Sequence, residues 1–406
     1  MVPKEWKIKT IGDIATVSSG GTPNRKEQAY WNGDIPWVTT AEVQFKTILD
    51  SAEKITKEGL TNSSAKLFPI NTILMAMYGQ GKTRGQVAKL GIEASTNQAC
   101  AAIILSSDYC VDYYYHFLIY QYENIRNMSN SGSQENLSGS IVKSIPVLVP
   151  PYFEQEKIAQ ILSTWDQAIS ATEKLLENSQ QQKKALMQQL LTGKKRLLDD
   201  DGVRFSATWL SKSLKDISKV SIGLVTTMTE HYVESGIPLI RNSDIKENRI
   251  TKEKLIKLSE DFANQNSGRK LSKGDVVTVH TGEVGVSAVI DDELDGCLGF
   301  ATLNTRPNKK IIDAQFLCWY FNSSRFIAHC ISLSTGDGRQ NLNLKDFSKV
   351  MIPVPSLLEQ KKIASALSLA AQEMETLQKR LDCLKREKKA LMQQLLTGKK
   401  RVKVAA

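Results

Sequence analysis

Two long stretches of the chain, residues 153–191 and 358–396, carry apolar side chains at alternating steps of four and three residues. This spacing is typical of the heptad seam of a coiled coil. Proline precedes each stretch, and a glycine followed by basic residues ends it, as expected for helix boundaries. Each stretch is predicted to form a helix of about 38 residues, roughly 57 Å long. The predicted seam residues, which would bind a partner helix, are Ile158, Leu162, Trp165, Ile169, Leu176, Leu186, Leu190, Ile363, Leu367, Met374, Leu377, Leu381, Leu384, Leu391 and Leu395.

The two predicted helices repeat one sequence. Residues 183–196 and 388–401 both read KKALMQQLLTGKKR, at an offset of 205 residues (388 minus 183). Because each seam needs an apolar partner and the matching seam is the other repeat, we predict an intrachain antiparallel coiled coil; two separate surface helices are the alternative. A duplicated chain can present two similar surfaces, and such a pair suits a partner that is itself two-fold, of which double-stranded DNA is the commonest.

The segments between the helices have a different texture. They contain short β-type apolar runs separated by turns rich in glycine and asparagine, and the two segments resemble each other only weakly. The predicted fold class is therefore α+β: two globular mixed α/β domains, joined by two long helices in a pseudo-two-fold internal repeat. The predicted boundaries are 1–150 for the first globular domain, 151–197 for the central helix, 198–355 for the second globular domain and 356–406 for the C-terminal helix.

Composition narrows the class of protein. The 406 residues include 53 Lys and Arg against 43 Asp and Glu, a net charge of +10 that favours a polyanionic partner. We found neither an apolar run of about 18 residues nor an apolar signal core, so a cytoplasmic protein that does not bind membranes is predicted. The six cysteines and four histidines are scattered, which predicts reduced buried thiols and no metal site.

Two motifs resemble catalytic sequences without matching them. Residues 79–83 (GQGKT) end like a phosphate-binding loop, but Ala76 stands where that loop needs its first glycine. Residues 149–153 (VPPYF) resemble the Asn/Asp-Pro-Pro-Tyr/Phe motif of amino-methyltransferases, but Val149 cannot accept a hydrogen bond from a flipped base. We therefore predict no catalytic residues and no cofactor bound by this chain.

The order of globular domain, heptad helix, globular domain and heptad helix, with LMQQLLTGKKR at both helix ends, resembles the specificity subunit of type I restriction–modification systems. The resemblance covers essentially the whole chain. It implies that each globular part is a target recognition domain for one half of a split, asymmetric DNA sequence. It also implies that the helices set the gap between the halves and dock two adenine-N6 methyltransferase (modification) subunits. S-adenosylmethionine, and ATP with Mg²⁺, would then be held by those subunits and by an added endonuclease/translocase (restriction) subunit.

Base recognition requires hydrogen-bonding side chains at base edges and cations at phosphates. Such residues gather in turns at corresponding places of the repeat, although any one of them could instead be a solvated or capping loop residue. The lysine and arginine clusters of the helices fit a solubilising face, spacer phosphates or an acidic patch on a partner. The candidate DNA-binding residues are Thr22, Asn24, Arg25, Lys82, Arg84, Gln86, Ser133, Gln134, Asn136, Thr226, Thr227, Arg241, Asn242, His280, Thr281, Arg339, Gln340 and Asn341.

Two other classes of function remain open at this stage. One is a coiled-coil adaptor of a DNA-processing complex that binds proteins without reading sequence, and the other is a self-contained methyltransferase or NTPase. The sequence does not determine the DNA target, the gap length or whether the locus restricts DNA. We expect poor solubility without partners, because docking helices would expose apolar surface.

Overall fold

The computed structural model describes residues 3–79, 81–128, 136–335 and 340–403. The chain folds into two compact units. The first unit comprises Met1–Glu173 and Lys379–Ala406, and the second comprises Lys174–Gln378. Each unit therefore combines one globular region with a segment of each long helix.

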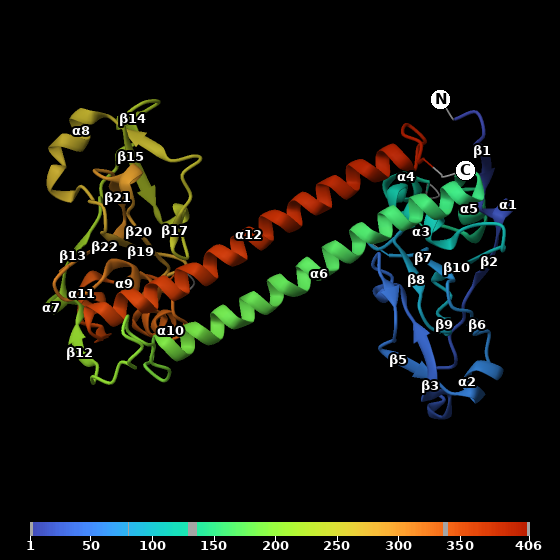
Figure 1. The fold of residues 1–406 in the computed structure, drawn as a ribbon, viewed down its shortest axis with the longest axis horizontal. Coiled ribbons are helices and arrows are strands. Elements are labelled where there is room, and N and C mark those ends of the chain that lie inside the picture. The colour runs from blue at the N-terminus through green and yellow to red at the C-terminus, as the bar shows by residue number, and fades with distance from the viewer. Residues whose placement is uncertain (1–2, 80, 129–135, 336–339, 404–406) are drawn as a thin grey trace. The chain divides into compact units, whose positions relative to one another are not determined.

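The long helices are α6 (Tyr152–Leu190) and α12 (Leu357–Leu395), each of 39 residues (Figure 1). Every predicted seam residue is buried or half-buried. Leu175 and Leu369, which lie off the seam, are instead 53% and 68% exposed. The heptad period thus separates the covered face of each helix from its exposed face.

Within each unit the two helices run antiparallel, as predicted. In the first unit, ion pairs join positions that rise along α12 to positions that fall along α6: Lys385 with Glu173 and Lys388 with Asp166. Arg401, just beyond the end of α12, pairs with Glu154 near the start of α6. In the second unit, the C-terminal end of α6 packs into the same core as the N-terminal part of α12, through Leu190, Leu191, Ile363 and Leu367.

The globular region of the first unit contains a five-stranded sheet ordered β2-β10-β7-β8-β4, a four-stranded sheet ordered β5-β3-β9-β6 and the pair β1-β11. Most neighbouring strands are antiparallel, whereas β3–β9 and β4–β8 are parallel. The strands are β1 (Lys7–Thr10), β2 (Ala15–Ser19), β3 (Trp31–Val38), β4 (Thr47–Ile48), β5 (Glu53–Ile55), β6 (Leu67–Phe68), β7 (Ile73–Ala76), β8 (Val87–Leu90), β9 (Ala94–Thr96), β10 (Cys100–Leu105) and β11 (Pro146–Val149). The short helices are α1 (Ile11–Ile14), α2 (Lys57–Thr61), α3 (Val111–Tyr120), α4 (Tyr122–Asn127) and α5 (Gly139–Ser144).

The second unit repeats this plan with sheets ordered β13-β22-β19-β20 and β14-β18-β15-β21 and the pairs β12-β23 and β16-β17. The strands are β12 (Leu210–Ser213), β13 (Ser218–Ile222), β14 (Tyr232–Val233), β15 (Ile237–Arg241), β16 (Ile245–Lys246), β17 (Arg249–Ile250), β18 (Ile256–Leu258), β19 (Val276–Val279), β20 (Ser287–Val289), β21 (Leu298–Phe300), β22 (Thr302–Pro307) and β23 (Met351–Val354). The short helices are α7 (Leu214–Ile217), α8 (Glu260–Gln265), α9 (Ala314–Phe321), α10 (Ser324–Leu333) and α11 (Leu344–Lys349).

The mixed α/β architecture with two long helices is the predicted fold class. Short apolar runs predicted the strands because the central strands, such as β7 and β19, are buried along their whole length and are largely apolar. Among the described residues, we found no helix long and apolar enough to cross a membrane.

Candidate nucleic-acid interface

The repeated LTGKKR motif forms the same turn at the end of both long helices. Gly193 and Gly398 have φ of +70° and +71°, a left-handed conformation that glycine adopts at little cost. Two residues later, the N–H of Lys195 donates to the carbonyl of Gln189 (3.1 Å), and the corresponding bond of Lys400 measures 3.0 Å. The turn reverses the chain and carries the following arginine back toward the other helix.

That arginine holds a buried glutamate at the start of the other helix. In the second unit, Arg196 donates from Nε and Nη2 to the two carboxylate oxygens of Glu359 (2.6 and 2.8 Å). Glu359 is 1% exposed and also accepts from Trp209 Nε1 (3.1 Å). Because a buried charge is stable only when it is paired and hydrogen-bonded, these three residues form one structural element.

The first unit contains the same element. Arg401 donates from Nε to Glu154 Oε2 (2.8 Å) and pairs through Nη2 with the other carboxylate oxygen. Trp6 Nε1 donates to the same carboxylate (3.4 Å), and Glu5 accepts a further bond from Arg401 (2.9 Å). The residues Glu154, Arg401 and Trp6, together with Glu359, Arg196 and Trp209, are called the helix frame below.

A glutamine next to each frame glutamate attaches the globular region to the helix. Gln155 accepts from the backbone N–H of Cys110 (2.9 Å) and donates to the Pro150 carbonyl (2.9 Å). In the second unit, Gln360 accepts from the N–H of Asp313 (2.7 Å) and donates to the Pro355 carbonyl (2.8 Å). Sequence reasoning missed the frame as a unit, although the Glu-Gln pair and the arginine both recur at the 205-residue offset.

In the second unit, the loops that carry candidate DNA-binding residues converge. The N–H of Ala301 donates to the Leu224 carbonyl (2.7 Å), next to the loop of Thr226 and Thr227, both of which are exposed. Asn242 donates to the Ala301 carbonyl (3.2 Å) and accepts from the N–H of His280 (3.0 Å). Long-range sheet pairing thus gathers three predicted loops around the end of β21.

A fourth loop joins this cluster. The N–H of Leu342 donates to the His280 carbonyl (3.0 Å), and that of Gly282 donates to the Gln340 carbonyl (3.2 Å). Thr281 also forms a β-bridge with Asn341. Burial lowers the pKa of His280, which favours a neutral imidazole that accepts from or donates to the Thr281 hydroxyl (2.8 Å). Arg339 lies outside the described residues.

The first unit builds a similar cluster around the end of β9. Thr22 donates its hydroxyl to Gln98 Oε1, and the N–H of Leu137 donates to the Met77 carbonyl (2.9 Å). The latter bond brings the loop of Asn136 to the end of β7, beside Gln86, whose carbonyl accepts from the N–H of Ala76 (2.9 Å). Ser133 and Gln134 lie outside the described residues.

The remaining candidates of the first unit differ in availability. Lys82 and Asn24 are exposed, whereas Arg84 is only 7% exposed. Arg25 lies 3.9 Å above the Trp31 ring and pairs with Glu53, and its pKa is raised by the hydrogen bond to that carboxylate. In the second unit, Arg241 forms two bonds to Asp244 (2.8 and 2.9 Å). A contact to DNA by either paired arginine would use its remaining N–H groups, and all these assignments stay predictions.

Sequence reasoning also missed exposed apolar residues within the loop clusters. Val225 is 62% exposed and Phe300 is 37% exposed in the second unit, and Tyr78 is 43% exposed in the first. No spacing rule marks such residues, because their exposure depends on where the sheets place the loops.

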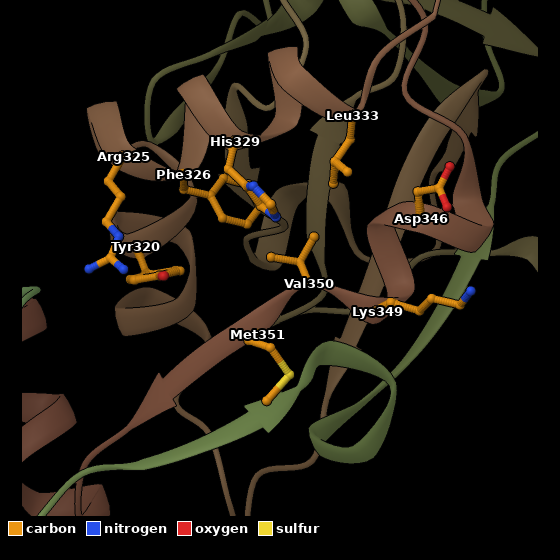
Figure 2. A pocket seen from close by; sticks show the side chains of 9 residues that line it. All are labelled: Tyr320, Arg325, Phe326, His329, Leu333, Asp346, Lys349, Val350 and Met351. Atoms are coloured by element: carbon orange, nitrogen blue, oxygen red, sulfur yellow. The ribbon is translucent and has the colours of Figure 1, made fainter.

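The second unit contains a cavity of 550 Å³ away from these loops. Figure 2 shows it between α10, α11 and the start of β23, with the lining residues Tyr320, Arg325, Phe326, His329, Leu333, Asp346, Lys349, Val350 and Met351. None of the candidate DNA-binding residues lines it. A second cavity of 410 Å³ runs along the C-terminal part of α6 and includes Lys183, Lys184, Lys194 and Arg325. Lys183 is paired there with Glu247 (2.6 Å), and the other cations would suit an anionic group.

Within the described ranges, no group of three or more His, Cys, Asp and Glu side chains could hold a metal ion. Burial raises the pKa of the Cys100 and Cys297 thiols to about 12, so both are protonated and unreactive near neutral pH.

The comparisons with known proteins agree on one family. The model of the type I restriction modification DNA specificity domain matches residues 3–179 and 207–386. The MjaIX specificity subunit of Methanocaldococcus jannaschii is 29% identical over 253 residues, a match that spans 59% of this chain and 58% of that relative. The MjaVIII specificity subunit of the same organism is 25% identical over 413 residues, covering 99% of this chain and 94% of the relative.

Solved structures share the fold at low identity. The type I restriction–modification S subunit from M. genitalium superposes with a TM-score of 0.62 at 17% identity and covers 96% of both chains. A chain from a structure described as the basis of complex assembly and conformational transition of the type I R-M system gives 0.58 at 16% identity, covering 98% of both chains.

Proposed function

Because the chain belongs to the type I restriction–modification DNA specificity family, with both halves matched, we propose that each unit reads one half of a bipartite, asymmetric DNA target. The observation that carries this proposal is the convergence of the candidate loops in each unit. Four loops of the second unit meet around β21, and equivalent loops of the first unit meet around β9. Such a cluster offers hydrogen-bonding side chains to base edges from a rigid sheet.

The helices are proposed to have two further roles. They set the spacer between the half-sites, and they dock two modification subunits, with a restriction subunit added for cleavage. Exposed Leu175 and Leu369 and the lysine-lined cavity beside α6 support a protein partner along the helices. The chain itself is proposed to catalyse nothing, with S-adenosylmethionine, and ATP with Mg²⁺, bound by its partners, in the cytoplasm.

The first experiment is long-read mapping of N6-methyladenine in a methylation-free host. The chain is expressed alone and together with the methyltransferase subunit of its locus. A bipartite methylated motif is expected only in the pair. Methylation by the chain alone would reveal a catalytic site in it, and no methylation in either case would favour an adaptor without sequence readout.

A domain exchange tests the assignment of half-sites. Replacing residues 198–355 with the equivalent domain of a relative should change one half of the methylated motif and leave the other intact. The exchanged segment leaves Arg196 and Glu359 in place but includes Trp209, so the donor domain should keep a tryptophan there. A change in both halves would contradict modular reading.

An insertion tests the spacer role. Seven residues added to α6 within 172–179, with seven added to α12 within 377–384, preserve the heptad register of both seams. The helices should lengthen by about 10.5 Å, equivalent to about three base pairs, while the bases read stay the same. The same insertion in α6 alone is the control. It should abolish methylation because α6 is then one heptad longer than α12, and the two seams no longer pair along their whole length. An unchanged gap in the double insertion would rule out the spacer role.

A further inference from the structure

The loop after β2 in the first unit and the equivalent loop after β13 in the second unit carry side chains of different polarity. In the first unit, the N–H of Gly21 donates to the Thr96 carbonyl at the end of β9 (2.8 Å). In the second unit, the N–H of Leu224 donates to the Gly299 carbonyl within β21 (2.7 Å). These equivalent bonds place Thr22 and Val225 at the same position of the repeat.

The strand connection beside this loop also differs in polarity between the two units. In the first unit, three residues connect β9 to β10, and one of them, Gln98, accepts the hydrogen bond of the Thr22 hydroxyl. In the second unit a single residue, Ala301, connects β21 to β22, and exposed Phe300 at the end of β21 is bridged to Leu224, next to Val225. Beside this loop, the first unit thus presents the polar pair Thr22 and Gln98, and the second presents the apolar pair Val225 and Phe300.

The backbone fixes the position of Phe300. The following residue, Ala301, has φ of +49°, which a non-glycine residue adopts at a cost of roughly 1–2 kcal/mol, and its N–H donates to the Leu224 carbonyl (2.7 Å). The preceding residue, Gly299, has no room for a side chain, because a Cβ there would lie 2.1 Å from Thr302 Oγ1. The exposed Phe300 side chain is therefore held by a tight, strained turn rather than left on a loose one.

Candidate DNA-binding residues surround this apolar pair. Phe300 lies opposite Arg241 in the register of β15 and β21, and Asn242 donates to the carbonyl of the next residue, Ala301. Thr226 and Thr227 directly follow Val225. An apolar group at the centre of a hydrogen-bonding surface suits a ligand with one apolar feature among polar ones. In the major groove of DNA, that feature is the 5-methyl group of thymine.

We infer that Val225 and Phe300 form a contact for a thymine methyl group in the half-site read by the second unit. The first unit has the Thr22–Gln98 pair beside the equivalent loop and reads its base by hydrogen bonding. This inference rests on the proposed function and adds to it the chemical feature that one position of one half-site must carry.

The test uses the assembled methyltransferase complex and duplexes in which uracil replaces thymine, one position at a time, in the mapped target. Uracil lacks only the methyl group. At one thymine of the second half-site, the replacement should weaken binding roughly threefold to fivefold. In the Phe300→Ala complex, the ratio of thymine to uracil affinity at that position should fall to about one.

Two variants control for other effects. Val225→Ala alters the same contact from the neighbouring loop and should also lower the ratio. Tyr78→Ala removes an exposed aromatic side chain from the first unit and should leave the ratio of the second half-site unchanged. Because all three side chains are substantially exposed, the variants are expected to fold.

The inference fails if the second half-site contains no thymine, if no uracil replacement there weakens binding, or if Phe300→Ala keeps the wild-type ratio. Loss of methyltransferase subunits from the Phe300→Ala complex with an unchanged ratio would assign the apolar pair to a protein contact instead. Failure of the proposed function is distinct, because the wild-type complex would then methylate no bipartite motif.

Discussion

The two units keep the same helix frame and differ in their loops. The second unit pairs Arg196 with Glu359, and the first pairs Arg401 with Glu154, each carboxylate also accepting from a tryptophan. The loop clusters share backbone connections, such as the bonds from Leu137 and Leu342 to equivalent carbonyls, but not side chains. Residues that hold the helices together thus stayed alike, while residues free to contact a ligand diverged.

One buried position departs from this rule. His116 on α3 lies 3.3 Å from the Ser163 hydroxyl of α6, whereas Trp319 on α9 donates to the Ser368 hydroxyl of α12 (3.0 Å). The two bonds are equivalent in the repeat. The first unit thus buries a titratable ring where the second buries one that does not titrate, so we expect their stabilities to differ in pH dependence.

The largest expected effect comes from breaking the frame. Arg196→Ala leaves the carboxylate of Glu359, 1% exposed, buried without its cation, and should lower the free energy of unfolding of the second unit by about 4 kcal/mol. Urea unfolding followed by tryptophan fluorescence measures this change. Lys195→Ala, at an exposed neighbour, is the control and should have no measurable effect.

Arg401→Ala should destabilise the first unit less than Arg196→Ala destabilises the second, because the Arg401 side chain is 38% exposed against 18% for Arg196. Equal losses would mean that exposure does not govern the pair.

The seam provides the next test. Leu367→Ala removes a side chain with no exposed surface and should cost about 3 kcal/mol, as should Leu162→Ala at the equivalent place of the first unit. Leu369→Ala, on the same helix but 68% exposed, should change the unfolding free energy by less than about 0.5 kcal/mol. Denaturant midpoints of the three variants check this. Similar losses at Leu367 and Leu369 would contradict the assignment of the seam.

The pH dependence should separate the units. Burial lowers the pKa of His116 from 6.5 to about 4, with Lys388 acting in the same direction and Asp166 opposing it. The folded state therefore holds a neutral ring. Above pH 6.5 this has no cost, but as the pH falls from 6.5 toward 4 the unfolded state binds a proton that the folded state does not. The first unit should lose about 2 to 3 kcal/mol between pH 7.5 and pH 4.5 from this group.

His116→Trp, which imports the residue of the second unit, should remove that part of the pH dependence. Thermal unfolding of both proteins at the two pH values measures it, and His116→Gln serves as a smaller neutral replacement. A wild-type first unit that loses no more stability between pH 7.5 and pH 4.5 than the His116→Gln variant would show that the ring is not held neutral.

The helix-end turns should give the smallest difference. Gly193→Ala imposes a side chain on a φ of +70° and should cost about 1 kcal/mol, because its Cβ would lie in ordinary contact with Trp209 at 3.5 Å. Gly398→Ala carries the same backbone cost but would place Cβ 2.4 Å from Pro3 Cγ, so the loss should approach about 2 kcal/mol. Melting temperatures of the two variants rank them, and the reverse order would refute the packing difference.

The long helices, their seam, the repeat and the antiparallel pairing could all be predicted from the amino-acid sequence. These follow from local periodicity and from the need of each apolar stripe, such as the one through Leu162 and Leu367, to find a complementary stripe. It also identified most of the loops that converge, because turn residues mark their positions. The buried pairing of Arg196 with Glu359 left a signal in the repeat, but its meaning required three-dimensional proximity over 163 residues.

Which loop residues are exposed together depends on tertiary contacts. Arg84 was a candidate from its charge, yet it is 7% exposed, while Phe300 carried no sequence signal and is exposed between polar loops. Pairing of strands distant in sequence, such as β15 with β21, brings these loops to one edge. Side-chain exposure at that edge is set by the non-local arrangement of sheets, which no local pattern of apolar and polar residues encodes.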